Sequence, residues 1–319
     1  MKLRRREVYA YIYFAGSAKE EVFNKKCRPS SGTRCTRVSH FLDGAYNHPR
    51  GEIVGREVIL KKEIKTAMEE KQLVLHYQPQ IELANGRLVG AEALLRWQHP
   101  SLGAMTPASF ISVAEEIGII NSIGQWAIHE ACRQAVFWQA KGHIDTTTSV
   151  NVSAGLISQR GFVEQIRNTL TETGLQPELL ELEITESMLV EDFDLVKESL
   201  NLVRNLGVRI ALDDFGTGFS SLMYLSQFPI DTLKIDQHFV RNLSQRNRLI
   251  IQSVIELAQK LHLGTIAEGV ETLNQAEFLL GAGCQLAQGY YFSSPLSPDA
   301  YAEYAIKASE TKPRRGHRH

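Results

Sequence analysis

From Ile59 onward the chain alternates between short apolar runs and amphipathic stretches, and this alternation constrains its fold more than any other feature. The apolar runs have the length and composition of strands: "TTTSVNVS", "LLELEIT", "VRIALDD", "DTLKID", "GTIAEG" and "CQLAQGYYF". Helical patterns lie between most of them. Strands that alternate with helices favour a sheet covered by helices, and this stretch has about the length of one (β/α) barrel.

The first two apolar runs, "LVLHYQPQIEL" and "RLVGAEALLRW", are separated only by "ANG". Asn-Gly is a strong hairpin signal, and a hairpin joins antiparallel strands. We therefore predict an α/β barrel whose first strand is antiparallel to the others. The expected helices span 106–118, 121–142, 161–173, 193–206, 248–262 and 273–283.

The composition divides the chain into three parts. Residues 1–58 are rich in Arg, Lys, Ser and Gly without sustained periodicity, which predicts a flexible or lightly folded extension. Residues 59–306 form the predicted barrel domain. The tail 307–319, "KASETKPRRGHRH", is basic and predicted to be disordered and solvated.

Charge and cysteine usage exclude several classes of protein. The formal net charge of -1 gives no reason to expect that the protein binds a nucleic acid duplex. The four cysteines are scattered without zinc spacing, which favours a reduced, cytoplasmic protein; they are Cys27, Cys35, Cys132 and Cys284. The apolar run Val8–Gly16 is too short to cross a bilayer, so we predict no membrane span.

Polar residues recur at the carboxyl ends of successive predicted strands. Glu92 lies in the second predicted strand, and the others end or follow later strands: Asn151, Glu183, Asp213, Asp214, Lys234, Asp236, Glu268, Glu271 and Gln288. In a barrel these ends converge on one mouth, where carboxylates repel one another unless cations neutralise them. Ligands that are all oxygen favour Mg²⁺ or Mn²⁺ over zinc or copper.

Any one of these acids, taken alone, fits a helix cap or a solvated loop, and Lys234 could pair with Asp231 on the surface. Their recurrence at the same end of strand after strand favours a metal site instead. Asp213 and Asp214 are adjacent, so both can face the mouth only if the strand ends between them and the chain turns. Gly216 and Gly218 permit such a turn.

Seven motifs occur in an order that resembles the EAL domain family of bacterial cyclic di-GMP phosphodiesterases, over about 59–306. They are "EALLRW" (92–97), "NVSA" (151–154), "EITES" (183–187), "DDFGTGFSSL" (213–222), "LKID" (233–236), "AEGVE" (267–271) and "QGYYFSSP" (288–295). The resemblance implies a modified TIM barrel with one reversed strand. It also implies hydrolysis of cyclic di-GMP to linear 5'-pGpG with two Mg²⁺ or Mn²⁺ ions.

The resemblance assigns metal ligands at Glu92, Asn151, Glu183, Asp213, Asp214 and Glu268. Asp213 would bridge both ions, because two cations that share a ligand can clamp a phosphodiester. Glu92, Glu268 and Lys234 match the catalytic group, with Lys234 helping to position and activate the attacking water.

Other positions match residues that hold the substrate or support the site. Arg96 and Gln78 match groups that hold phosphate and guanine, Arg96 because its planar fork can bind two oxygens. Gln288 matches a glutamine near the attacking water, alongside Lys234. Supporting roles fall on Glu186, Glu271, Asp236, Gly216 and Gly218.

Two alternatives remain open at this point. A catalytically silent EAL domain would act as a cyclic di-GMP receptor or protein-interaction module. Such domains usually lack some metal ligands or the glycine-containing loop after Asp214, whereas this sequence has all of the ligands and both Gly216 and Gly218. A Mg²⁺-dependent barrel lyase could recruit Lys234 as its base, but adjacent aspartates fit phosphoryl chemistry better. Because members of this family dimerise near the glycine loop, we also expect a homodimer whose formation tunes activity.

Overall fold

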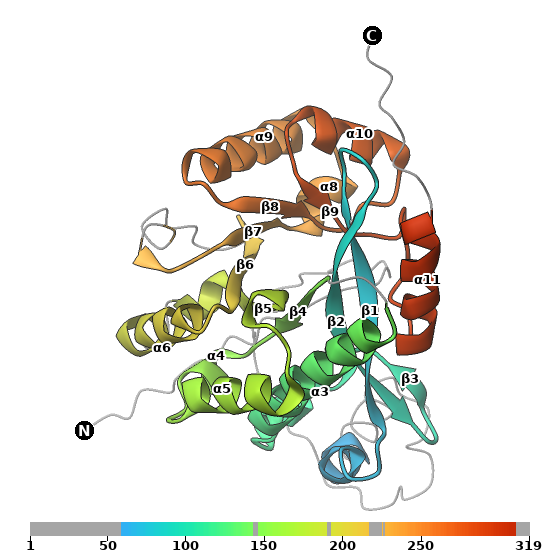
Figure 1. Ribbon diagram of the computed structural model, residues 1–319, viewed down its shortest axis with the longest axis vertical. Coiled ribbons are helices and arrows are strands. Elements are labelled where there is room, and N and C mark those ends of the chain that lie inside the picture. The colour runs from blue at the N-terminus through green and yellow to red at the C-terminus, as the bar shows by residue number, and fades with distance from the viewer. Residues whose placement is uncertain (1–58, 143–145, 190–192, 217–224, 226, 311–319) are drawn as a thin grey trace, which may run out of the picture.

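The computed structural model describes residues 59–142, 146–189, 193–216, 225 and 227–310. The predictions for the extension 1–58 and for most of the tail therefore lie outside the described residues. Within the described ranges the strands form a single nine-stranded sheet, and helices surround it (Figure 1).

The sheet closes into a barrel of eight strands, with the ninth, β3, attached outside it. The order around the sheet is β1-β9-β8-β7-β6-β5-β4-β2-β3, and an additional β1–β2 pairing closes the ring. The strands are β1 Leu73–Glu82, β2 Leu88–His99, β3 Gly103–Met105, β4 Thr147–Asn151, β5 Leu180–Thr185, β6 Arg209–Phe215, β7 Thr232–Ile235, β8 Gly264–Ala267 and β9 Leu286–Ala287.

Strand directions confirm the reversed first strand. β1 pairs antiparallel with both of its neighbours, β2 and β9, whereas the pairs from β2 through β4 to β9 are parallel. The β1–β2 hairpin turns through Gly86, which has φ +74°. Asn85 Oδ1 accepts a hydrogen bond of 2.8 Å from the Arg87 backbone N–H and fixes the turn.

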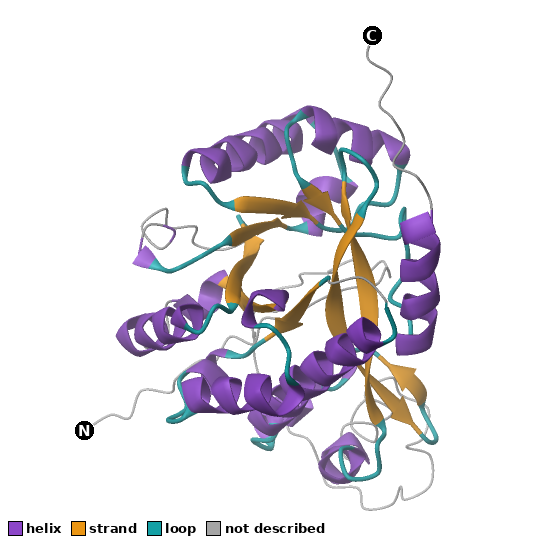
Figure 2. Cartoon of the chain, in the orientation of Figure 1, coloured by secondary structure: helices purple, strands orange, loops and turns teal. Residues whose placement is uncertain are grey.

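Helices cover the outside of the barrel, as Figure 2 shows in purple around the orange strands. The α-helices are α2 Ile111–Glu116, α3 Ile120–Ala140, α4 Ala154–Ile157, α5 Phe162–Thr173, α6 Phe193–Asn205, α8 Gln237–Arg241, α9 Gln245–Lys260, α10 Leu273–Gly281 and α11 Pro298–Glu310. Residues 59–67 are also helical. The 3-10 segments are η1 Pro107–Ser109, η2 Pro177–Leu179 and η3 Glu186–Leu189. None of the described helices has the length and hydropathy needed to cross a membrane.

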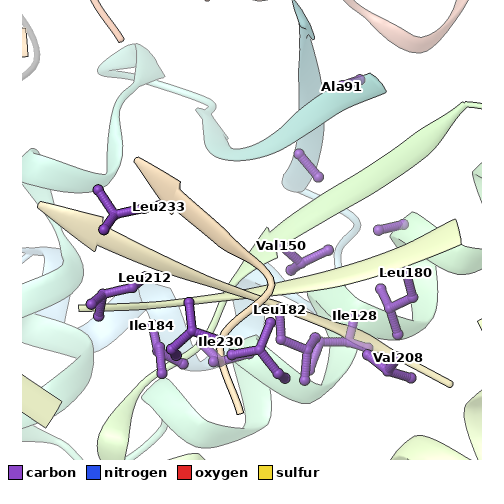
Figure 3. Packing of buried hydrophobic residues seen from close by; sticks show 14 of the residues in the cluster. Ala91, Ile128, Val150, Leu180, Leu182, Ile184, Val208, Leu212, Ile230 and Leu233 are labelled. Carbon is purple, nitrogen blue, oxygen red and sulfur yellow. The ribbon is translucent and has the colours of Figure 1, made fainter. Parts of the chain in front are cut away.

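The main core lies between the strands and the helices. Alternate residues of a strand face opposite sides, so Leu182 and Ile184 of β5 point outward while Glu181 and Glu183 point into the barrel. Figure 3 shows part of the outward layer, which includes Leu182 and Ile184 of β5 and Ile128 of α3. The outer layer is thus apolar, and the barrel interior is free to carry polar side chains.

A second hydrophobic cluster lies at the far end of the β1–β2 hairpin. It joins the helix 59–67 to the start of β1, the end of β2 and α2, with Trp97 fully buried at its centre. Trp97 Nε1 donates a hydrogen bond of 2.9 Å to Gln72 Oε1. This packing anchors the part of the hairpin that extends past the barrel.

Several elements differ from the sequence prediction. The helix expected over 106–118 divides into η1 and α2, because Phe110 leaves helical geometry, with φ -145°, to bury its ring. The strand expected over 284–292 keeps only Leu286–Ala287, since the backbone turns at Gly289. The helices 59–67, α4, α8 and α11 and the strand β3 were not predicted. α11 continues to Glu310, past the expected domain boundary at Ile306.

Gly289 tests how tightly the β9 turn is packed. A Cβ at this position would overlap the backbone N, C and O atoms of Val270, which cannot move as a side chain can. We expect Gly289→Ala to lower the free energy of unfolding by about 2–3 kcal/mol, measured by urea denaturation.

Gly281 is the matched control, because a Cβ there meets no atom within 4 Å. Gly281→Ala at the end of α10 should leave stability unchanged or raise it by up to about 1 kcal/mol. Equal unfolding midpoints for Gly289→Ala and the wild type would contradict the packing argument.

Candidate active site

The carboxyl ends of the parallel strands bring four carboxylates around one buried ammonium. Lys234 Nζ of β7 lies 2.6 Å from Glu183 Oε2 of β5 and 3.2 Å from Asp213 Oδ2 of β6. Its distances to Glu268 Oε1, just after β8, and Glu92 Oε2 of β2 are 2.7 Å and 3.8 Å. Lys234 is 1% exposed, so these charges face each other largely without water. Surface pairing of Lys234 is excluded, and Asp231 pairs with Arg204 instead.

Three amides extend the cluster on the side of β1 and β2. Asn151 Nδ2 donates to Glu92 Oε1 at 2.7 Å. Gln288 Nε2 donates to Glu92 Oε2 at 2.5 Å and to Gln78 Oε1 at 3.1 Å. Gln78 in turn donates to the Ser293 carbonyl at 3.1 Å. Glu92 therefore lies where residues from β1, β2, β4, β7 and the loop after β9 meet.

The adjacent aspartates are arranged by a bulge and not by the end of a strand. β6 continues to Phe215, so the predicted strand end between Asp213 and Asp214 is wrong. Asp214 takes φ +57°, and the register with β7 shifts between Leu212 and Phe215. A left-handed residue in a bulge re-aims its neighbours, so the two side chains need not point to opposite faces although the strand continues.

The electrostatics of the cluster show that one ammonium does not balance its neighbours. Burial alone would lower the pKa of Lys234, but Asp213, Glu183, Glu268 and Glu92 raise it well above its ordinary value. Burial raises the pKa of Glu183, and the charge of Glu92 raises it further. Burial and the charge of Asp213 raise the pKa of Glu268 in the same way. The site thus favours additional positive charge, supplied by protons or by cations.

Asp214 and Asp236 form a second acidic pair beside this cluster. Burial, then the charge of Asp213 and then that of Asp236, raise the pKa of Asp214 to about 7. Asp236 caps α8 by accepting a hydrogen bond of 2.8 Å from the His238 backbone N–H, and its carboxylate also contacts the His238 ring. Asp236 is therefore held in place by the start of a helix that the sequence prediction did not contain.

The donor set fits a hard divalent cation. The side chains that meet here offer oxygen ligands, which Mg²⁺ and Mn²⁺ prefer. Glu183 Oε1 is buried and has no hydrogen-bond partner among the described residues, so its lone pairs are available to a cation. In the described ranges no three acidic, histidine or cysteine side chains already surround a shared ion position. The carboxylates converge on the Lys234 ammonium instead.

Arg96 lies near this cluster on β2, and His76 accompanies it on β1. Arg96 is half-buried, burial lowers its pKa, and the charge of Glu92 opposes that shift. His76 lies two residues before Gln78; burial and then the nearby Arg96 charge lower the pKa of its imidazole. His76 was not among the predicted site residues, although its two-residue spacing from Gln78 places it on the same face of β1.

Of the predicted supporting residues, Glu186 and Gly216 lie next to strands that carry site residues, whereas Glu271 lies outside the cluster. Glu186 is buried in η3, directly after β5. Gly216 takes φ +96°, and a Cβ there would come within 3.2 Å of the Phe239 ring. Glu271 lies outside the cluster, where its Oε1 is 3.3 Å from Arg241 Nε. Gly218 lies outside the described residues.

Comparison with known proteins places this site in a family. The family model described as "EAL domain" matches residues 61–295. Over 239 residues the chain is 43% identical to the bifunctional diguanylate cyclase/cyclic di-GMP phosphodiesterase MucR of Pseudomonas aeruginosa, which covers 74% of this chain and 35% of MucR. It is 41% identical to the cyclic di-GMP phosphodiesterase NbdA of the same organism, over 78% of this chain and 32% of NbdA. The chain thus matches about a third of the length of these relatives.

Solved structures agree with the sequence matches. The structure titled "PaMucR Phosphodiesterase, c-di-GMP complex" superposes with a TM-score of 0.73 at 42% identity, covering 76% of this chain and 98% of that one. The EAL domain of Mycobacterium smegmatis DcpA gives a TM-score of 0.64 at 36% identity, over 75% of this chain and 97% of that one. These matches confirm the TIM-like barrel with one reversed strand. The chain belongs to the EAL domain family.

Proposed function

We propose that this chain hydrolyses cyclic di-GMP to linear 5'-pGpG with the help of two Mg²⁺ or Mn²⁺ ions. The observation that carries the proposal is the cluster of four carboxylates on Lys234, which holds more negative charge than one ammonium balances. The relatives named as cyclic di-GMP phosphodiesterases, and the MucR complex, support the choice of substrate.

The acidic residues are proposed to hold the ions. Glu92, Asn151, Glu183 and Asp213 would hold one ion, and Asp213, Asp214 and Glu268 the other. When bound, divalent ions supply positive charge that stabilises the phosphodiester transition state and acidifies the attacking water. The buried acceptor Glu183 Oε1 supports this assignment, since it lacks a hydrogen-bond donor among the described groups.

Lys234 is proposed to orient the attacking water and to compensate charge that develops during hydrolysis. The water oxygen bonds to phosphorus, the bond from phosphorus to the 3' oxygen breaks, and that oxygen takes up a proton. Arg96 would bind the second phosphate through its planar fork, while Gln78 and Gln288 would align the substrate beside Glu92. The hydrogen bonds from Gln288 to Glu92 and Gln78 support a shared role for these amides.

The substrate assignment is tested by incubating the purified chain with cyclic di-GMP and Mg²⁺ or Mn²⁺ and separating the products by chromatography. We expect 5'-pGpG from the wild type and at least a 100-fold lower rate from Glu183→Gln, since loss of a ligand charge removes transition-state stabilisation. Glu172→Gln on α5 is the matched control and should keep full activity, because Glu172 lies on the surface beside His129.

Two results would redirect the proposal. Tight binding of cyclic di-GMP without cleavage would make the chain a receptor. Cleavage at the wild-type rate by Glu183→Gln would remove the cluster from the chemistry and leave the substrate assignment standing.

The raised pKa values predict that ion binding depends on pH. At pH 6 Asp214, with a pKa of about 7, is mostly protonated, so a cation must displace its proton; at pH 8 it is already ionised. We expect Mg²⁺ affinity to rise about 10-fold or more between these pH values. Calorimetry in buffers of different ionisation enthalpy would measure the released protons.

Asp214→Asn provides the control for this pH dependence. The variant should release fewer protons at pH 6 than the wild type does, because the amide carries none to displace. Identical proton release by both chains would show that Asp214 takes no part in ion binding.

We propose that self-association tunes this activity through the segment 213–222, by setting the positions of the two proposed ligands at its start, Asp213 and Asp214. Activity per subunit should therefore rise with protein concentration across a dilution series followed by analytical ultracentrifugation. A flat activity over a range in which monomer converts to dimer would contradict the coupling.

A further inference from the structure

A second polar layer lies inside the barrel, one layer below the proposed active site. Its members precede site residues on the same strands by two positions: Ser149 before Asn151, Glu181 before Glu183, and Thr232 before Lys234. A two-residue step along a strand returns to the same face, so each pair projects into the interior. All three deeper residues are buried, with Glu181 5% exposed.

The carboxylate of Glu181 connects strands that are not neighbours in the sheet. Ser149 Oγ of β4 donates to Glu181 Oε1 at 2.9 Å, and Thr232 Oγ1 of β7 donates to Glu181 Oε2 at 2.8 Å. β6 separates β5 from β7 in the sheet, so the bond to Thr232 crosses the barrel interior. One side chain therefore joins the strands that carry Asn151, Glu183 and Lys234.

The sequence makes room for this layer elsewhere in the ring. Gln80 of β1 reaches across the interior, with Nε2 3.4 Å from Ser149 Oγ. Gly90 of β2 permits this, because a Cβ there would overlap Gln80 Oε1. At the start of β6, Arg209 Nε lies 3.9 Å from Glu181 Oε2 and partly compensates the buried charge.

We infer that Glu181 is a positioning residue, which sets the separation of the proposed metal ligands Asn151 and Glu183 and of Lys234 by joining β4, β5 and β7. The inference rests on the proposed function, but assigns a role to a group that touches neither substrate nor ions. In a closed barrel each strand is already held by two neighbours and can shift only slightly. A hydrogen bond across the interior limits this remaining movement and so fixes the relative positions of the strand ends.

Two variants test the inference against a matched control. Glu181→Gln keeps the shape but offers an NH₂ group where one hydroxyl donates, and Thr232→Val removes the donor of β7. Thr148→Val is the control: Thr148 neighbours Ser149 and is equally buried, but its Oγ1 has no hydrogen-bond partner among the described residues. Mn²⁺ affinity is measured by calorimetry, together with kcat, KM for cyclic di-GMP and the thermal midpoint.

We expect Glu181→Gln and Thr232→Val to weaken Mn²⁺ binding about 10-fold, at the lower end of what loss of an outer partner costs. For both, kcat should fall while KM stays near the wild-type value, and Thr148→Val should match the wild type in every measurement except stability. A role limited to stability would lower the thermal midpoint and leave Mn²⁺ affinity and kcat unchanged, which would overturn the inference. Thr232→Val retains the carboxylate and decides the matter if Glu181→Gln does not fold.

The wild type separates this inference from the proposed function. A wild-type chain that binds Mn²⁺ and cleaves cyclic di-GMP, with variants that behave identically, would overturn the positioning role alone. A wild-type chain that neither binds Mn²⁺ nor cleaves would overturn both.

Discussion

The ammonium of Lys234 and the four carboxylates around it are the interaction on which the rest of the site depends. Taking an ammonium out of water is costly, and removing one partner of a buried ion pair typically costs about 3–5 kcal/mol. Here the attraction of four acids outweighs that cost for Lys234. It does not remove the repulsion among the acids, whose raised pKa values for Glu183 and Glu268 record the imbalance. The carboxylates at the mouth of the barrel are therefore stabilised by additional positive charge, whether from protons or from cations.

The closed barrel explains how the chain maintains such an unfavourable cluster. The outward residues of each strand, such as Leu182 and Ile184 of β5, bury apolar surface against the helices and stabilise the ring. The inward residues of the same strand, Glu181 and Glu183, are then free to be polar. Within one strand, alternate residues therefore serve different ends: the outward ones stabilise the barrel and the inward ones form the site. A substitution on one face leaves the residues of the other face in their positions.

Much of this arrangement could be predicted from local patterns, and the remainder depends on closure. The positions of Asn151 and Glu183 at or near the ends of β4 and β5 follow from apolar runs that end in polar residues, whereas Glu92 lies within β2. The left-handed bulge at Asp214 is not visible locally, because it depends on the register between β6 and β7. The contact between Glu181 and Thr232 joins residues 51 positions apart, and only the closed ring brings them together. The shortened β9 likewise results from the close approach of Gly289 to Val270.

The reversed first strand gives this barrel a mouth that differs on one side from the others. Around most of the ring the strands end and loops follow, but β1 and β2 continue as a paired hairpin, in which Gln78 lies opposite Glu92 and Val74 opposite Arg96. The second hydrophobic cluster, with Trp97 at its centre, fixes the outer end of that hairpin. Side chains on paired strands hold their separation better than side chains on loops. Arg96 is therefore held at a set distance from the carboxylates, which suits the role proposed for it in binding a second phosphate.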